Sequence, residues 1–472
     1  MRGPFFGAFG ASDHSSLGMS ELDAYYHGAQ PLSYLAPEVA SAVSGRLRSM
    51  VINIPRLVVD SIEDRLDVEG FRLSGAGDAD AEMWRIWQAN DLDEWSQQAH
   101  LEALIYGRAF VMVWADPDGG DTPRITVESA RQITVEYDAA QRRIVSATKV
   151  WRQGDLQLRT IYGPEVFIRQ VRLSDDDQWE ERAEPIRNVL GVVPVVPFVN
   201  RPTLLRPLGE SEMTDAIPIT DGINKLTTDM MVSAEHHAQP RRWATGIEMG
   251  GAAGAERTAA EVKKNWTDAA AGRVWLSDSP NASFGQFPEA TLDNYVRAVD
   301  MLTARGAALS GLPPHYFGQA GENPASADAL RASESSLVKR ALRKQRVFGG
   351  AWERVMRLAV LVQTGSVPAE MSRLETIWRS AETPTIAQKA DAAVKLLQSG
   401  AIDKAQAQED LGYTPEQIGR MQERSQSATT APERARVALA RELQAEGLSE
   451  NAALAAAGLL QAASLNSAER PA

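Results

Sequence analysis

The spacing of apolar residues changes twice along this chain. Up to residue 107, apolar side chains recur at intervals of three and four residues, as in amphipathic helices. Between residues 108 and 200 the interval becomes two, which is typical of antiparallel strands. From residue 209 the helical interval returns and continues toward the C-terminus. The pattern therefore predicts an α+β protein in which an antiparallel sheet region lies between helical segments.

Two helices are predicted before the sheet. The first runs through SGRLRSMVINIPRLVVDSIEDRL, 44–66, and we expect Pro55 to kink it. The second occupies 81–107 and ends at Gly107, because glycine accepts the left-handed backbone found at helix ends. Its pattern includes Trp84, Trp87, Trp95, Leu101 and Leu104.

The sheet region is expected to end in an edge strand. Alternating runs separated by turn residues predict the strands themselves, which are FVMVWAD, RITVES, QITVEYD, IVSATKVW, LQLRTIY and VFIRQVRL. The segment NVLGVVPVVPFVN, 188–200, follows them. Its prolines cannot donate to a central ladder, so we expect an extended segment at the edge of the sheet.

The second half of the chain is predicted to be mainly helical. A helix over 209–238, with Pro218 near its start or a kink, is followed by a mixed segment, 239–287, with short strands at RRWATG and RVWLSD. A helix over 288–310 has Pro288 in its first turn. A helix from about Ser326 to Gln363 is expected to be about 55 Å long. The remainder, 366–472, is expected to be helical, with helix ends at Gly400 and Gly412.

The stretch GLPPHYFGQAGENPAS, 311–326, interrupts two good helices. Gly311 and Pro313 end the first helix, and Pro324 with the N-cap residue Ser326 begins the second. The residues between them are free to protrude. The sequence therefore predicts an adjustable loop at this point.

Composition limits the function classes. The 472 residues carry a net charge of -13 and include no cysteine. Disulfides, thiolate metal sites and cysteine nucleophiles are therefore excluded, and a cytosolic origin is expected. No apolar run approaches the roughly 20 residues of a membrane helix, so we expect a soluble protein. The acidic balance is opposite to that of proteins that grip DNA tightly, so any contact with DNA is expected to be weak or local.

No catalytic constellation is recognised. Nucleotide-binding loops, nucleophile elbows and zinc-protease helices are absent from the sequence. Glu235, His236 and His237 are expected to form a polar helix end rather than a metal site. The acidic runs 174–184 and 116–121 are expected to be solvated turns. We therefore expect no cofactor, no metal and no enzymatic activity.

The strongest positive cluster is KRALRKQR, 339–346, within the predicted long helix. Such a run is usually a solvated or interface surface, and contact with DNA is the alternative. The candidate residues are Lys339, Arg340, Arg343, Lys344 and Arg346.

The order of segments resembles that of the portal proteins of tailed bacteriophages, in particular those of phages that infect actinobacteria. The likeness covers nearly the whole chain. It is carried by LDAYYHGAQPLSYL, INIPRLVVDSIEDRLDVEGFRL, GVVPVVPFVNRP with the following GESEMTDAI helix, the SGLPPHYFG to ASADALRASES passage, and ETIWRSAETPTIAQKADAAVKLLQSGAIDKAQAQEDLGYTPEQI.

The resemblance implies a ring, usually a dodecamer, at one vertex of the capsid of the virion. Double-stranded DNA would pass through its channel during packaging and ejection. Implied partners are other copies of the chain, the terminase, scaffolding and major capsid proteins, and head-completion or adaptor proteins. Assembly would take place in the host cytoplasm, without a membrane.

The resemblance also implies a division of the chain into the parts of a portal subunit. These parts are an N-terminal arm, 1–24; a wing, 25–208, joined by part of 366–382; stem helices, 209–238 and 288–310; a clip, 239–287; a tunnel loop, 311–326; a long wing helix, 327–365; and a crown with a C-terminal tail, 366–472. The residues that could line the channel are Pro313, Pro314, His315, Tyr316, Phe317, Gln319, Glu322 and Asn323.

Two other functions remain open from the residues alone. A metal-dependent nuclease could use the acidic turns at 116–121 and 174–184. A capsid adaptor or scaffolding protein could bind a partner helix through the Ala-rich C-terminus, 424–472.

Overall fold

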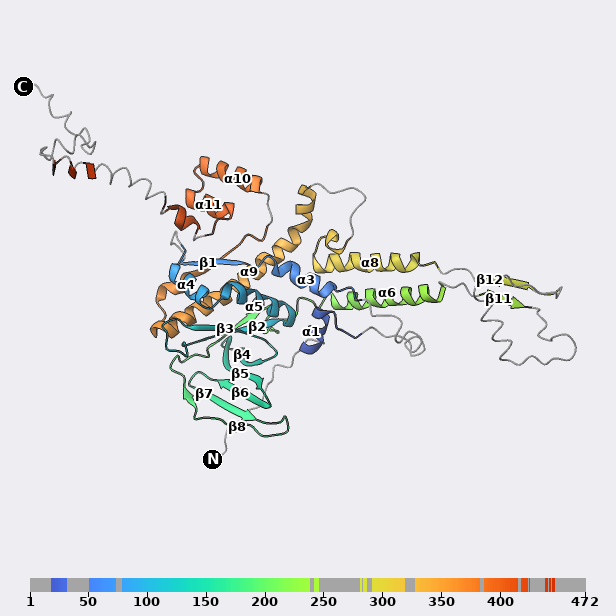
Figure 1. The fold of residues 1–472 in the computed structure, drawn as a ribbon, viewed down its shortest axis with the longest axis horizontal. Helices are drawn as coiled ribbons and strands as arrows, with labels where there is room; N and C mark the ends of the chain where they lie inside the picture. The colour runs from blue at the N-terminus through green and yellow to red at the C-terminus, as the bar shows by residue number, and fades with distance from the viewer. Residues whose placement is uncertain are drawn as a thin grey trace, which may run out of the picture. The chain divides into compact units, whose positions relative to one another are not determined.

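The structure is a computed structural model that divides the chain into two compact units (Figure 1). The first, here called the sheet unit, includes Ser61–Glu210 and Val338–Ala472, and the second, here called the helix-pair unit, includes Asp13–Asp60 and Ser211–Leu337. Within them the structure describes residues 18–31, 51–73, 79–237, 242–245, 281, 283–286, 291–318, 327–382, 386–414, 417–422, 424, 438–439, 441–442 and 444–445.

The sheet unit contains the antiparallel strands that the alternating pattern predicts. One sheet has the order β10-β2-β3, and a larger one has the order β4-β5-β6-β7-β8, with β9 also paired to β7. The bounds are β2 Arg108–Trp114, β3 Arg124–Glu128, β4 Ile133–Asp138, β5 Arg143–Gln153, β6 Leu156–Tyr162, β7 Val166–Arg172, β8 Glu180–Glu181, β9 Ile186–Arg187 and β10 Val195–Val199. The expectation of an edge strand is confirmed, because β10 ends its sheet.

A further two-stranded sheet was not predicted. β1, Val68–Leu73, pairs antiparallel with β13, Leu374–Trp378. The second strand follows a short 3-10 helix, η2, Ala369–Arg373, so the expectation that 366–472 is entirely helical is wrong here. The two strands lie some 300 residues apart in the sequence. Such long-range pairing leaves little trace in local residue spacing, which reports mainly on one segment at a time.

The helix predicted over 81–107 is divided in two. α4, Ala81–Ala89, and α5, Leu92–Tyr106, are separated by Asn90 and Asp91. The Asn90 side chain donates to the carbonyls of Ile86 and Pro123, at 2.9 Å each, and accepts from the Ile125 amide at 2.8 Å. The Asn90 side chain thus bonds to backbone groups in place of the next helical residues, and α4 ends here. The predicted end of α5 at Gly107 is confirmed, with a left-handed φ of 82°.

The long helix α9, Ala327–Thr364, confirms its prediction and brings the core of the sheet unit together. Trp352 is fully buried, and its ring centroid lies 4.8 Å from that of Trp87 and 4.6 Å from that of Phe198. These edge-on ring contacts join α9 to α4 and β10. Segments far apart in the sequence therefore share one apolar core.

A neutral histidine lies at the centre of this core. His100 of α5 is completely buried, stacks on Phe348 with ring centroids 5.3 Å apart, and accepts a 2.9 Å hydrogen bond at Nε2 from the Trp352 indole N–H. Acceptance at Nε2 places the proton of the neutral imidazole on Nδ1. Burial lowers the pKa of His100 to about 3. The side chain therefore stays uncharged in the folded protein at neutral pH.

A second buried junction surrounds Asn200, just beyond β10. Its side chain donates to the Glu210 carbonyl at 2.9 Å, and its backbone N–H donates to the Gly107 carbonyl at 2.8 Å. Gly209 has a left-handed φ of 75°, and a Cβ atom there would lie 2.1 Å from the Asn200 carbonyl oxygen. Only glycine fits this close backbone approach.

The C-terminal helices end where the sequence predicts. α10, Ile386–Gln398, is followed by Gly400, and α11, Lys404–Leu411, by Gly412. Both glycines have positive φ angles. The Asp403 carboxylate caps α11 by accepting from the Gln406 amide at 2.8 Å.

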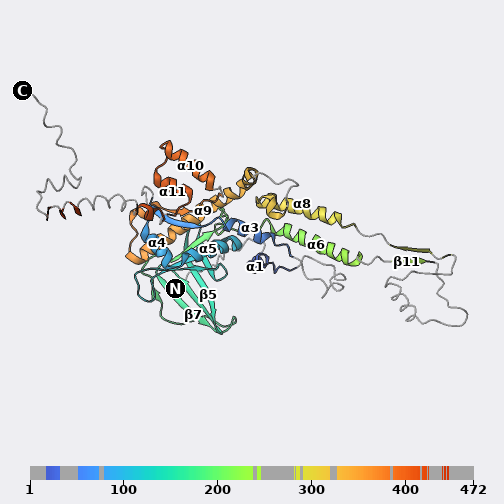
Figure 2. The ribbon, with the colours of Figure 1, turned by 45° about the horizontal axis from the view of Figure 1, so that its top comes forward.

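The helix-pair unit is built on two helices that lie side by side (Figures 1 and 2). They are α6, Ile217–His237, and α8, Asp293–Ser310. Pro218 lies in the first turn of α6, so the alternative of a true start is the one confirmed. Glycines allow the helices to approach, since a Cβ on Gly222 would lie 3.1 Å from Leu302 Cδ1.

The segment between these helices contains a strand pair. β11, Arg242–Thr245, confirms the strand predicted at RRWATG, and it pairs with β12, Ser283–Gln286. The strand expected at RVWLSD and the residue Pro288 lie outside the described residues. The helix expected from 288 begins at Asp293.

N-terminal residues anchor the base of α6. The Tyr25 hydroxyl of α1, Met19–His27, donates to the Asp221 carboxylate at 2.9 Å, and the Ile52 amide donates to Asn224 Oδ1 at 2.8 Å. Burial and then the hydrogen bond to Asp221 raise the pKa of Tyr25 to about 12. In α3, Ile54–Glu63, Pro55 lies in the first turn, so the predicted kink is wrong. The pattern there marks a helix start, where proline is well tolerated.

The buried His100 makes the stability of the fold depend on pH. Its pKa is about 3 in the folded protein and about 6.5 when unfolded, so the unfolded chain binds more protons between these values. The contribution of neutral His100 to the free energy of unfolding is complete above about pH 6.5 and falls as the pH decreases. We expect His100→Gln to reduce the slope of the free energy of unfolding against pH by about 1 kcal/mol per pH unit between about pH 6.5 and 5.5. Urea denaturation at each pH measures it, and identical slopes for both proteins would contradict the assignment.

The close approach at Gly209 predicts a large effect of one methyl group. Gly209→Ala should lower the free energy of unfolding by about 3 kcal/mol or more, because it combines left-handed strain with a clash against backbone. Gly154→Ala is the matched control, with φ of 62° and no atom within 4 Å of its Cβ, and should cost about 1 to 2 kcal/mol. Equal losses in urea denaturation would show that the approach at Gly209 is not tight.

Candidate functional site

The helix break that the sequence predicts begins at Ser310 in the helix-pair unit. α8 ends at Gly311, which has a left-handed backbone with φ 66° and ψ 17°. The Ser310 hydroxyl donates to the Ala307 carbonyl at 3.2 Å and accepts from the Leu312 amide at 3.4 Å. Leu312 is buried, and Pro313 continues in an extended conformation with φ -61° and ψ 143°. The chain therefore leaves the helix axis at a fixed point.

A single 3-10 turn, η1, Pro314–Phe317, follows the break. The Tyr316 amide donates to the Pro313 carbonyl at 3.0 Å, and the Gly318 amide donates to the His315 carbonyl at 3.1 Å. Gly318 again has a left-handed φ of 73°. The turn is thus shaped by its own backbone hydrogen bonds between two glycine-dependent bends.

Two aromatic side chains of this turn fasten it to neighbouring helices. The Tyr316 hydroxyl donates to Glu334 of α9 at 3.4 Å. Phe317 Cε1 lies 4.0 Å from the position of a Cβ on Gly306 of α8, which is an ordinary contact distance, so the ring lies against this helix. Pro314 and His315, in contrast, are exposed. The turn therefore exposes Pro314 and His315, here called its tip, to solvent, while Tyr316 and Phe317 lie against α9 and α8.

The predicted channel residues differ in how far they are exposed to solvent. Pro313 is buried, Pro314 and His315 are exposed, and Tyr316 and Phe317 are half-buried. The remaining candidates, Gln319, Glu322 and Asn323, lie outside the described residues.

The basic cluster on α9 contains one buried member. Lys339, Arg343 and Arg346 are exposed and lie three or four residues apart, which places them on one helix face. Arg340 is half-buried. Lys344 is only 6% exposed, and its ammonium group donates to Asn200 Oδ1. The expectation of an exposed basic contact is therefore wrong for Lys344, which belongs to the Asn200 junction.

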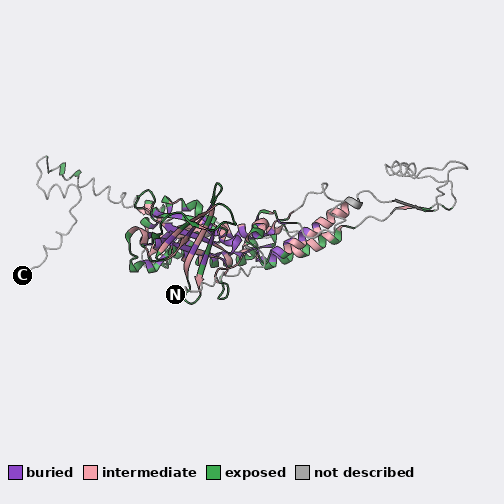
Figure 3. Ribbon diagram, turned by 90° about the horizontal axis from the view of Figure 1, so that it is seen from below, coloured by how far each residue is buried: buried purple, intermediate pink, exposed green. Residues whose placement is uncertain are grey.

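The helix pair exposes several large apolar side chains. On α8, Val296 is 49% exposed, Met301 55% and Leu309 60%. Figure 3 shows α6 and α8 coloured mainly as intermediate or exposed. The sequence gives no signal for this, because the spacing of apolar residues is the same whether a helix packs within its own chain or against another. The pair has more apolar surface than its own contact covers.

The acidic turns are occupied by local contacts. Asp116 accepts from the Gly120 amide at 3.0 Å, as in a side-chain-capped turn. Asp175 lies 2.6 Å from the Arg172 guanidinium and 2.7 Å from Gln157 Nε2. Both observations agree with the expected turns, but the expectation is wrong for Glu180–Glu181, which forms β8. Among the residues that the structure describes, no three potential metal ligands lie together. Within the same residues no helix is both long and apolar enough to cross a membrane.

Comparison with known proteins gives consistent results. Residues 19–431 match the family model described as phage portal protein, SPP1 Gp6-like. The chain is 38% identical over 380 residues to the portal protein of Mycobacterium phage L5, covering 77% of this chain and 76% of that protein. It is 37% identical over 395 residues to the portal protein of Mycobacterium phage D29, covering 80% and 79%.

A solved structure is also similar. It is described as the neck of an empty GTA particle computed with C6 symmetry, and the match has a TM-score of 0.48 and 11% identity over 84% of this chain and 93% of that chain. The assignment to a family depends on the sequence matches, which extend through both units and the helix break. On these matches, the chain belongs to the phage portal protein family and has the α+β portal fold, so it is a structural component of a phage virion.

Proposed function

We propose that twelve copies of this chain form a ring at one capsid vertex, through which double-stranded DNA enters during packaging and leaves during ejection. Terminase, scaffolding and major capsid proteins, and head-completion proteins would dock on the ring, which would assemble in the host cytoplasm. Membership of the portal family supports this role. In this proposal the chain catalyses no reaction, and a separate motor hydrolyses ATP.

The observation that carries the proposal is the exposed apolar surface of α8. Met301 and Leu309 are more than half exposed on a helix that already packs against α6. Helices in a ring have neighbours on both sides, because each subunit presents two different patches to two neighbouring copies. Covering these side chains in a ring would stabilise the assembly through the hydrophobic effect.

The resemblance to portal proteins supports a division of the subunit into parts. In the proposal, 209–238 and 288–310 form the stem, 239–287 the clip and 311–326 the tunnel loop. The wing is 25–208, joined by part of 366–382 and by the long helix 327–365, and the crown follows. The N-terminal arm is 1–24.

The exposed tip at His315 supports a role for the break in contact with DNA. One such tip from each subunit would face the channel, together with its neighbours in the tunnel loop. A weak grip suits a conduit, because each basic contact to phosphate adds about 0.9 to the salt slope of binding. The net charge of -13 is compatible with sliding rather than tight binding.

The ring predicts that charges on α8 prevent assembly without unfolding the chain. We expect the double variant Met301→Asp with Leu309→Asp to lose the ring, because carboxylates would be buried between subunits. Mass photometry of wild type and variant measures this, with circular dichroism as a test of folding.

Leu173→Asp is the matched control, since Leu173 is 71% exposed and lies in the sheet unit. It should leave the ring intact. Rings that persist in the α8 double variant would contradict the assignment of this surface.

The tip predicts a separate effect on DNA. His315→Glu should leave the ring intact but reduce the proportion of DNA-filled heads, because a circle of carboxylates repels the phosphate backbone. His315→Gln, which adds no charge, should be close to wild type. Electron microscopy of particles from complemented infections counts filled heads, and equal filling for both variants would exclude His315 from the channel wall.

A further inference from the structure

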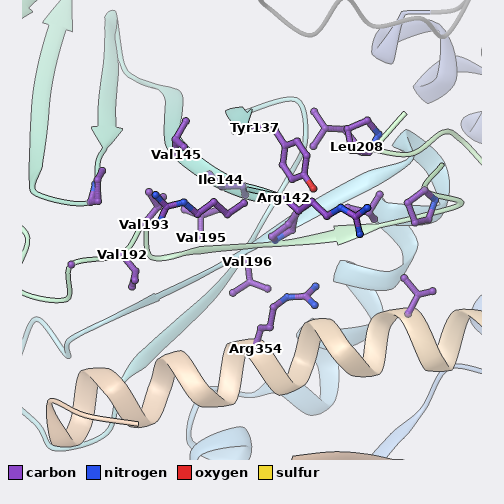
Figure 4. A pocket seen from close by; sticks show the side chains of 18 residues that line it. Tyr137, Arg142, Ile144, Val145, Val192, Val193, Val195, Val196, Leu208 and Arg354 are labelled. Carbon is purple, nitrogen blue, oxygen red and sulfur yellow. The ribbon is translucent and has the colours of Figure 1, made fainter. Parts of the chain in front are cut away.

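A pocket of about 550 Å³ lies within the sheet unit, beside strand β10 (Figure 4). Its walls come from β10, from the end of β4 and the start of β5 with the turn between them, from residues 191–193 and 202–208, and from α9. Every lining residue, including Val347 and Arg354 of α9, belongs to the sheet unit. The pocket is therefore a feature of one folded body, and it is separate from the helix break.

One wall of the pocket is apolar and includes a strand edge. Val193, Val195, Val196 and Ile144 line it, and Figure 4 shows them around the pocket with Tyr137. β10 is the terminal strand of its sheet, and no described strand pairs with its second edge.

The ladder register shows which backbone groups of β10 point to that edge. Asn200 N–H donates to the Gly107 carbonyl, and Val113 N–H donates to the Pro194 carbonyl. In an antiparallel ladder the bonded residues alternate, so Val195, Pro197 and Val199 direct their backbone groups outward. Proline lacks an N–H, which leaves outward donors at Val195 and Val199.

The pocket also gathers positive charge, and none of its lining residues is acidic. Arg142, Arg143 and Arg354 line it. No hydrogen bond or ion pair to a described residue occupies their guanidinium groups. Burial, followed by repulsion from Arg357, lowers the pKa of Arg354, and attraction to Glu353 opposes this shift only in part. In a chain with net charge -13, three arginines on a wall without acidic residues favour an anionic occupant.

We propose that this pocket docks an extended acidic peptide segment of another protein, with apolar side chains against the valines and carboxylates on Arg143 and Arg354. The segment would lie along the free edge of β10 and form main-chain hydrogen bonds at Val195 and Val199. Five strand residues span about 17 Å, so about five residues of the partner are in contact.

The chemistry of the walls selects a peptide over nucleic acid. The three arginines are exposed, as cations that contact DNA are, but they lie in a concave space beside valines and prolines, whereas a DNA backbone is matched by a polar surface. Exposed backbone donors of a strand edge recognise an extended chain. All the residues that would contact the peptide belong to the sheet unit, so peptide binding can be tested whether or not the chain forms a ring.

A labelled peptide of alternating glutamate and valine, capped at both ends, is the probe. We expect saturable binding to the full chain by fluorescence anisotropy, and binding roughly tenfold or more weaker for Arg354→Ala, because a charged hydrogen bond is lost. Arg143→Ala should act in the same direction. Arg169→Ala is the matched control, an exposed arginine of β7 outside the pocket, and should bind like wild type.

Other outcomes would overturn the proposal. They are the absence of saturable binding, equal affinity for the corresponding lysine and valine peptide, or equal affinity of the Arg354→Ala and Arg169→Ala variants. Displacement of the peptide by a short DNA duplex would assign the pocket to nucleic acid instead. Binding to the isolated subunit but not to an assembled ring would assign it to a neighbouring copy. Thermal unfolding followed by circular dichroism confirms that each variant is folded.

Discussion

The packing of α9 against the aromatic core of the sheet unit is the constraint on which the rest of the structure depends. Trp352 is fully buried among Trp87 and Phe198, and it donates to His100, so one helical residue joins two other helices and a strand. This packing excludes water from a histidine, which can remain there only uncharged. It also fixes the C-terminal part of the helix whose other end follows the helix break.

Local residue spacing predicts much of this fold. The alternating runs between residues 108 and 200 became strands, and α9 begins and ends within one residue of its expected bounds. Glycines mark helix ends reliably at Gly107, Gly400 and Gly412, because the left-handed backbone there is costly for other residues. These signals are short in range, and each acts within its own segment.

Long-range interactions account for the features that spacing does not predict. The pairing of β1 with β13 joins distant segments, and Asn90 ends α4 through contacts with residues beyond the helix. Burial of Lys344 depends on Asn200, which lies 144 residues away. The helix break itself was predicted from proline and glycine, but its exposed tip and the aromatic base formed by Tyr316 and Phe317 depend on packing against α8 and α9.

In the ring that we propose, α8 contacts a neighbouring copy and the helix break faces the axis. A cryo-electron microscopy reconstruction of the assembled protein tests this arrangement. It should show a closed annulus with Met301 and Leu309 buried between subunits and His315 at the wall of the opening. An assembly in which α8 remains exposed to solvent, or in which His315 lies on the outer surface, would contradict it.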